Sequence, residues 1–182
     1  MSGTVIFVVA SCLLAYVSRH SLKIPSSHGF FRFFAWEAML ALFIINAALW
    51  FDDITSPQQM LSWFLLFCSL VLVAPGAYAF LRSGNISARR EGPALFPFER
   101  TTTLVTTGAY RYIRHPMYSA LLFLAWGTYF KDPSWPGTFL AIAASILLFK
   151  TATADEAECI GYFGDAYREY MRTTRRFVPF LF

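Results

Sequence analysis

Charged residues are scarce in this sequence: Asp, Glu, Lys and Arg make up 14% of its 182 residues, and 57% are hydrophobic. A soluble domain has about 25% charged and about 45–50% apolar residues. The shortage of charge therefore argues against an ordinary soluble domain and favours an integral membrane protein. No linker, repeat or low-complexity tract divides the chain, so we expect a single domain, 1–182.

Cysteine is also scarce, and Cys12, Cys68 and Cys159 lie far apart. The sequence therefore predicts no disulfide framework, and we expect the cysteines to be small buried hydrophobic residues. The histidines do not pair at helical spacing with cysteines or carboxylates, which argues against a zinc site. The phosphate-binding patterns G-x-x-x-x-G-K-S/T and G-x-G-x-x-G and the nucleophile pattern G-x-S-x-G are also absent.

Five apolar stretches occupy much of the chain, at residues 4–17, 33–51, 60–81, 117–130 and 135–153. A straight bilayer crossing needs about 20 residues, which the second and third stretches supply and the fifth nearly supplies. The first and fourth are short, so they would be tilted, enclosed by protein or extended by amphipathic flanks. No Lys or Arg precedes the first stretch and no A-x-A site follows it, so we expect a spanning helix rather than a signal peptide. The predicted fold class is an all-α integral membrane protein with about five transmembrane helices.

The placement of charge supports this count. If five helices alternate across the bilayer, segments 18–32, 82–116 and 154–182 share one side and hold nearly every cation. By the positive-inside rule this side is cytoplasmic, so the N-terminus is predicted outside and the C-terminus inside. Cations beside the membrane meet anionic lipid, so the net charge of +4 does not indicate nucleic-acid binding.

The C-terminal segment predicts an amphipathic interfacial helix. Cys159, Phe163, Tyr167 and Tyr170 recur at helical spacing, and the charged residues among them fall largely on the other side. The chain then ends with RRFVPFLF, in which cations stand beside aromatic residues, a pattern typical of an interfacial anchor.

The longest polar segment, 82–116, ends in GAYRYIRHP and leads into the fourth apolar stretch. Such long loops are uncommon in compact domains unless they serve a function. A short hairpin joins the fourth and fifth stretches, so Arg111, Arg114 and His115 should lie close to Asp155 and Glu156. Two interpretations remain open. The charges form salt bridges that only pin two helix ends, or they form a pocket for a ligand with a carboxylate and an ammonium group, with tyrosine faces for a cation.

Two segments, TTTLVTTGAYRYIRHPMY and DEAECIGYFGDAYREYMRTTRRFVP, together resemble the isoprenylcysteine carboxyl methyltransferase family and its relatives, the integral-membrane phospholipid methyltransferases. The shared pattern is L-V-x-x-G-x-Y-x-x-x-R-H-P-x-Y, followed one hairpin later by an acidic pair and F-G-x-x-Y-x-x-Y. The resemblance covers roughly residues 100–180. It implies S-adenosylmethionine as methyl donor, with S-adenosylhomocysteine as product. It also divides the domain into N-terminal transmembrane helices, 1–81, and a cofactor-binding region, 82–182.

The resemblance implies the site residues as well. The positions that match the family's cofactor pocket are Thr102, Thr103, Leu104, Val105, Tyr110, His115, Pro116, Met117, Tyr118, Asp155 and Glu156. The expected catalytic residues are Glu156, Arg114 and His115, and no metal is expected. Glu156 or His115 would take a proton from an amine or phenol acceptor, whereas an anionic acceptor needs no base. The family commonly has Glu where this chain has Asp155, and the prenylcysteine enzymes carry an Arg where it has Thr151, which leaves the acceptor open.

The predicted function is in-line methyl transfer in the membrane to a hydrophobic or lipid-like acceptor, such as an isoprenylcysteine-type carboxylate or a phospholipid amine. A kink at Pro75 in the third helix and the short fourth helix would leave a gap that admits the acceptor from the lipid bilayer. One alternative is an NADPH-dependent enzyme like the sterol reductases, which share R-H-P-like and D-E-x-x-C patterns but have roughly twice the helices. Another is a non-enzymatic membrane scaffold or accessory protein.

Overall fold

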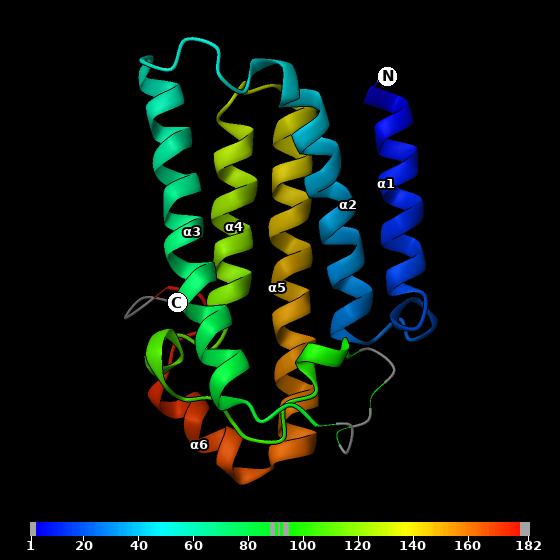
Figure 1. The fold of residues 1–182 in the computed structure, drawn as a ribbon, viewed down its shortest axis with the longest axis vertical. Coiled ribbons are helices and arrows are strands. Elements are labelled where there is room, and N and C mark those ends of the chain that lie inside the picture. The colour runs from blue at the N-terminus through cyan, green and yellow to red at the C-terminus, as the bar shows by residue number, and fades with distance from the viewer. Residues whose placement is uncertain (1–2, 88–89, 91, 93–94, 179–182) are drawn as a thin grey trace.

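The computed structural model of the protein describes residues 3–87, 90, 92 and 95–178. Its α-helices are α1 (Gly3–Ser18), α2 (His28–Asn46), α3 (Pro57–Ser83), α4 (Pro116–Tyr129), α5 (Trp135–Phe163) and α6 (Asp165–Thr173). The first five run side by side along the long axis, and α6 lies across one end (Figure 1). Short 3-10 turns include Pro97–Glu99 and Gly108–Arg111. The described residues form no β-strand beyond two isolated bridges, so the prediction of an all-α fold is confirmed.

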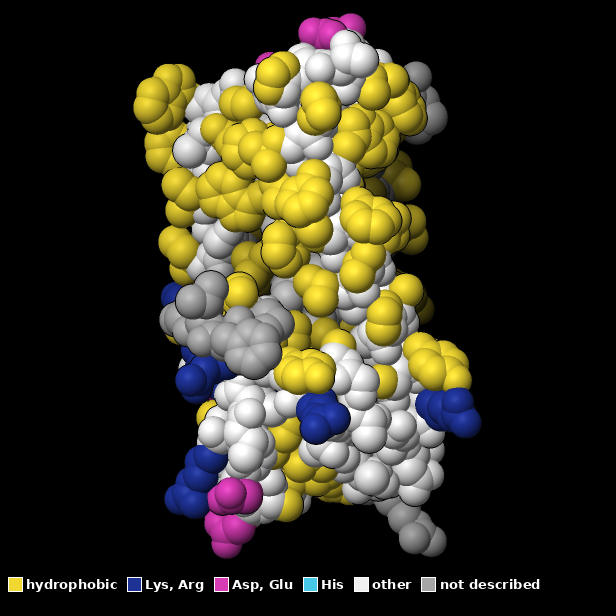
Figure 2. Space-filling view, turned by 90° about the vertical axis from the view of Figure 1, so that its left-hand side faces the viewer, with side chains coloured by type: hydrophobic (Ala, Val, Ile, Leu, Met, Phe, Trp, Pro, Cys, Tyr) yellow, Lys and Arg dark blue, Asp and Glu magenta, His cyan; other side chains and the backbone are white. Residues whose placement is uncertain are grey.

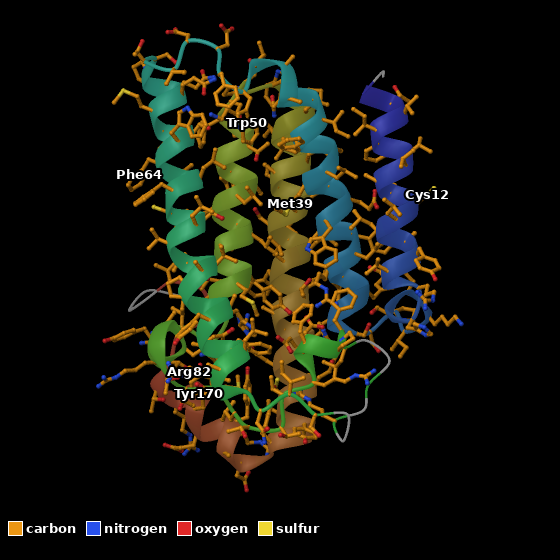
Figure 3. The ribbon with its side chains drawn as sticks, in the orientation of Figure 1. Cys12, Met39, Trp50, Phe64, Arg82 and Tyr170 are labelled. Carbon is orange, nitrogen blue, oxygen red and sulfur yellow. The ribbon has the colours of Figure 1, made fainter. Side chains whose placement is uncertain are left out.

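Three helical segments are long and apolar enough to cross a membrane: His28–Leu49, Pro57–Ser83 and Trp135–Phe163. The helices α1 and α4 are apolar but shorter, so the count of five crossings stays a prediction. Hydrophobic side chains cover most of the face seen in Figure 2, and Lys and Arg gather toward its lower end. The side chain of Cys12 points away from the other helices (Figure 3) and is exposed, so the prediction of buried cysteines is wrong for this residue.

Two helix boundaries differ from the apolar stretches. The helix α2 already begins at His28, where the Ser27 hydroxyl accepts a hydrogen bond from the Phe30 N–H and caps the first turn. The helix α5 continues to Phe163. Its last turns are polar, so they lie beyond the apolar stretch, but their backbone is still helical. Gly164, with φ of +61°, then breaks the chain direction before α6. Cys159 and Phe163 therefore belong to α5, and the amphipathic helix is shorter than predicted.

The helices pack as two close pairs, α2 on α5 and α3 on α4. Two glycines bring α3 and α4 together: a Cβ at Gly76 would lie 3.4 Å from Pro116, and a Cβ at Gly127 would lie 2.9 Å from the Leu66 side chain. Small residues of this kind allow close helix contact in membranes. The predicted gap beside Pro75 is therefore closed between these two helices. An apolar groove of about 400 Å³ instead follows the surface of the pair, and its lining includes Leu61, Leu65, Leu122, Phe123, Trp126 and Phe177.

A buried lysine ties the helix ends together at the end of the molecule where Trp50 lies (Figure 3). The Lys131 ammonium donates to Gln59 Oε1 at 3.0 Å and lies 3.5 Å from the centre of the Trp63 ring. The Lys131 carbonyl in turn accepts hydrogen bonds from the side chains of Gln58 and Gln59. The turn after α4 is thereby fixed to the first turn of α3.

We expect Lys131→Met to lower the free energy of unfolding by about 2 kcal/mol, because a desolvated cation–π contact is worth about that much. The Oε1 atom of Gln59 would also lose the ammonium that donates a hydrogen bond to it. Thermal unfolding in detergent measures the effect. The same substitution at the exposed Lys23 serves as the control and should leave the midpoint unchanged. Equal midpoints for the two variants would contradict a structural role for the Lys131 cluster.

Candidate functional site

The short length of α4 creates a recess at the other end of the bundle. The helix α4 has 14 residues, whereas its neighbours α3 and α5 have 27 and 29. Each helical residue adds about 1.5 Å, so the first turn of α4 lies well inside the ends of its neighbours (Figure 1). The polar residues that precede α4 fold into this recess. They therefore lie deep in the protein but stay outside the apolar middle of the bundle.

The floor of the recess is an ionic cluster around Glu156, which is 4% exposed. Its carboxylate accepts hydrogen bonds from Arg114 Nε at 2.9 Å and from Arg176 Nη2 at 2.5 Å. The Nε2 atom of His115 lies 3.3 Å from the same carboxylate. The predicted convergence of the inner ends of α4 and α5 is therefore confirmed for Arg114 and His115. The prediction is wrong for Arg111, which is exposed and lies beside the Tyr112 ring.

Residues 174–178, which we name the C-terminal strap, complete this cluster. The Arg114 N–H donates to the Arg175 carbonyl at 2.7 Å, and the His115 N–H donates to the Arg176 carbonyl at 3.2 Å. The Phe177 ring is buried, and its carbonyl accepts a hydrogen bond from Ser119 Oγ at 2.8 Å. This part of RRFVPFLF thus supports the ionic cluster, with Phe177 buried rather than placed at a membrane interface, and residues 179–182 lie outside the described residues.

A pocket of about 80 Å³ opens beside the ionic cluster. Most of the predicted site residues line it: Thr103, Leu104, Val105, Tyr110, Arg114, His115, Met117, Tyr118 and Asp155. Three others lie elsewhere. The Thr102 hydroxyl donates to the Asn85 carbonyl at 2.8 Å, Pro116 packs against Gly76, and Glu156 is enclosed by its cations.

Two polar groups that face the pocket are weakly satisfied. The Asp155 carboxylate lies 3.3 Å from the Tyr118 hydroxyl and 3.6 Å from His115 Nδ1, and it has no closer charged partner among the residues that the structure describes. The Tyr110 phenol oxygen is buried and has no hydrogen-bond partner among the described residues. Burial raises the pKa of the Tyr110 phenol, so this group is a neutral donor. A ligand that suits this pocket offers a hydrogen-bond acceptor to the Tyr110 phenol and a cation to the Asp155 carboxylate.

Sequence reasoning missed a second group of pocket residues, His28, Arg90, Glu99 and Cys159. The Glu99 carboxylate pairs with Arg32, and His28 Nδ1 lies 2.7 Å from Glu158 Oε2. Burial raises the pKa of Glu99, but the hydrogen bond from His28 and the charge of Arg32 lower it further, so the net shift is downward. The folded state is thus stabilised by this carboxylate above its unfolded pKa, and the gain is lost as the pH falls through the lowered value. The sequence offered one signal for this group, because Glu99 is an acidic residue within the Arg-rich segment 82–116.

Part of the chain is similar to known proteins. A family model described as "Phospholipid methyltransferase" matches residues 58–164. The "Protein-S-isoprenylcysteine O-methyltransferase" of Schizosaccharomyces pombe is 33% identical over 82 residues, which are 43% of this chain and 34% of the relative. The match therefore spans about a third of the relative's length. The family match includes α3, α4, α5 and the pocket-lining segment between α3 and α4, but neither α2 nor the C-terminal strap.

Proposed function

The chain belongs to the phospholipid methyltransferase family, and we propose that it transfers a methyl group from S-adenosylmethionine to a hydrophobic or lipid-like acceptor. A phospholipid amine and an isoprenylcysteine-type carboxylate are the acceptor classes that the family and the Schizosaccharomyces pombe relative suggest. S-adenosylhomocysteine is the product of such a transfer. Nucleic acid and metal have no part in this proposal.

The difference between two neighbouring carboxylates carries the proposal. Glu156 is enclosed by Arg114, Arg176 and His115, whereas Asp155 lines the pocket and has no charged partner closer than 3.6 Å in the described part of the chain. The methyl donor has an ammonium group and a sulfonium cation, which suit a carboxylate of this kind and the tyrosine faces beside it. Its polar nucleoside atoms suit the unpartnered phenol of Tyr110. The donor set of the pocket thus fits S-adenosylmethionine.

Each charged residue takes a separate role in this proposal. When bound, the donor supplies a methyl group on a positively charged sulfur, which an acceptor displaces in line. Arg114 lines the pocket and offers positive charge to the donor carboxylate. His115 also lines the pocket and takes the proton of an amine acceptor, whereas a carboxylate acceptor needs no base. Glu156 has no contact with the pocket and acts by holding Arg114 and His115 in place.

The acceptor is expected to reach this site from the bilayer. The apolar groove along α3 and α4 includes Phe177, whose ring centre is 6.2 Å from that of the pocket-lining His115. An acyl or prenyl chain in the groove would therefore leave its polar end close to the wall of the pocket. Positioning of this kind supplies most of the acceleration in a displacement that needs no covalent intermediate.

The proposal includes a topology. The chain would cross the bilayer five times as one domain, 1–182, with the N-terminus outside and with the C-terminus and the site in the cytoplasm. Residues 1–81 would form the N-terminal transmembrane helices, and residues 82–182 would form the cofactor-binding region with the last two transmembrane helices and the cytoplasmic C-terminal helix. The excess of Lys and Arg at the end of the molecule that holds the site supports this orientation.

Calorimetry on the purified protein tests the proposal. S-adenosylmethionine should give a binding heat, and NADPH should give none. Heat with NADPH would favour the reductase alternative, and heat with neither ligand would favour the scaffold. Membranes that contain the protein, supplied with methyl-labelled donor, should then yield a labelled lipid-like product that identifies the acceptor.

Asp155→Asn is expected to weaken donor binding roughly 10- to 100-fold, because a charge-assisted hydrogen bond contributes about 1.5–3 kcal/mol. The amide keeps the shape of the side chain but removes the charge that faces the donor ammonium. Asp165→Asn is the matched control, since this exposed residue of α6 pairs only with Arg168 on the surface. Equal donor affinities in the two variants would remove the main support for the proposed ligand.

A further inference from the structure

The closed pocket is too small for the proposed ligand. Its volume is about 80 Å³, whereas pockets for small ligands usually measure about 300–1,000 Å³. Part of its wall belongs to packed helices, but another part is the segment 95–107, whose helical content is the single turn Pro97–Glu99. Entry of a nucleoside therefore requires this segment to move outward.

The segment 95–107 is tied to α2 by a group that we name the α2 latch, consisting of His28, Arg32 and Glu99. The Arg32 guanidinium pairs with the Glu99 carboxylate, and His28 Nε2 lies 3.6 Å from the other oxygen of that carboxylate. Both residues of α2 are buried, with exposures of 3% for Arg32 and 1% for His28. The Phe96 ring stacks on Trp36 at 5.9 Å and covers the guanidinium.

The latch also reaches α5. The His28 N–H donates to Glu158 Oε1 at 2.9 Å, and the His28 ring contacts the other oxygen of Glu158. Glu158 lies one helical turn from Asp155, whose carboxylate faces the pocket. Charged contacts thus connect the segment 95–107 through α2 to α5, the helix that carries Asp155.

We propose that Arg32 and His28 are positioning residues that hold the segment 95–107 closed over the pocket through Glu99, so that the donor enters when the latch opens and is retained when it closes. The inference rests on the proposed function for the identity of the ligand. It assigns a role to α2, which lies outside the residues that match the family.

A buried ion pair suits a contact that has to open. The attraction between Arg32 and Glu99 is offset by the cost of removing both ions from water, so the closed state is only modestly favoured. Two guanidinium nitrogens of Arg32, Nε and Nη2, are buried without a partner among the described residues, which increases that cost. Water hydrates both ions in the open state. Contacts between a bound donor and the wall then shift the balance toward closure.

The thiol of Cys159 provides a readout of opening that needs no donor. Cys159 lines the pocket, and Arg90, from the same side as the movable wall, has Nη2 3.8 Å from its sulfur. In a Cys12→Ser, Cys68→Ala background, N-ethylmaleimide modifies only this residue. Opening of the wall should therefore control the rate of alkylation.

Glu99→Gln and Arg32→Gln are expected to raise the alkylation rate about tenfold, as the loss of a charge-assisted hydrogen bond implies. Arg32→Lys keeps the charge and should retain most of the protection. Asp165→Asn, which breaks an exposed ion pair in α6 at the same end of the molecule, is the control and should not change the rate. Size-exclusion profiles and helical circular dichroism identify the folded variants. If Glu99→Gln does not fold, Arg32→Gln and Arg32→Lys decide the question.

Calorimetry with S-adenosylmethionine separates the two proposals. The latch variants should bind the donor about tenfold more weakly than the parent, and saturating donor should slow alkylation in the parent. Unchanged alkylation rates in the folded Gln variants would overturn the latch, whatever the donor affinity. Absence of donor binding in the parent would overturn the proposed function, whereas the alkylation rates would still decide whether the latch holds the wall.

Discussion

Glu156→Gln is expected to abolish measurable donor binding and to lower the free energy of unfolding by about 3–5 kcal/mol, the usual cost of breaking a buried ion pair on one side. The amide fills the same space but leaves the guanidinium groups of Arg114 and Arg176 without their counter-ion. These cations lie on the approach to α4 and on the C-terminal strap, so their repulsion would separate both from α5. Thermal unfolding and calorimetry with S-adenosylmethionine measure the two effects.

Glu169→Gln is the matched control for this substitution. Glu169 accepts a hydrogen bond from Arg172 at 2.9 Å, but both side chains are exposed on α6. Exposed ion pairs contribute about 0–1 kcal/mol, so the control should keep its stability and its donor affinity. Retention of normal donor binding by Glu156→Gln would show that the ionic cluster only joins helix ends, which was the other interpretation of the sequence pattern.

The meeting of Arg114 and His115 with Glu156 could be predicted from the sequence because a short hairpin leaves the chain little choice. The turn KDPSWPG forces α4 and α5 to lie antiparallel and adjacent, so the residues that precede α4 must lie beside the inner turns of α5. The position of the polar segment directly before α4 could also be predicted, since a proline at the first helical position marks where α4 begins. Local constraints thus identified the core of the site.

The contribution of α2 could not be predicted in the same way. His28 and Glu158 are 130 positions apart, and no short connection brings α2 beside α5. In a membrane helix the lipid-facing and protein-facing sides are both apolar, so hydrophobic patterning does not reveal which helices pack together. The pairing of Arg32 with Glu99 became visible only once α2 and the segment before α4 were placed next to each other.

The end of the chain shows why composition alone was misleading. Cations beside aromatic residues are typical of a membrane interface, and RRFVPFLF has that composition. The C-terminal strap departs from it because its backbone pairs with residues 112–115, as in the parallel bridge between Ile113 and Arg175. A hydrogen-bond partner so far away in the sequence cannot be recognised from a local pattern, although this pairing places the Phe177 ring inside the protein.

Phe177→Ala is expected to lower the free energy of unfolding by about 3–5 kcal/mol, the usual cost of the cavity left by a buried phenylalanine. The ring is 5% exposed and packs in one cluster with Tyr118, whose hydroxyl faces Asp155. Loss of the ring would also free His115, and we expect donor binding to weaken by at least about tenfold. Thermal unfolding and calorimetry measure both changes.

The control for this last substitution is Phe139→Ala on α5, because the Phe139 ring is 70% exposed on the apolar surface of the bundle. Removing an exposed ring leaves no cavity, so stability and donor affinity should stay close to those of the parent. If the strap served only as a membrane anchor, the two variants would have the same stability and the same donor affinity, since each would lose one ring from the lipid-facing surface. A loss of donor binding confined to Phe177→Ala would instead mean that the strap supports the pocket by holding His115 and Tyr118 in place.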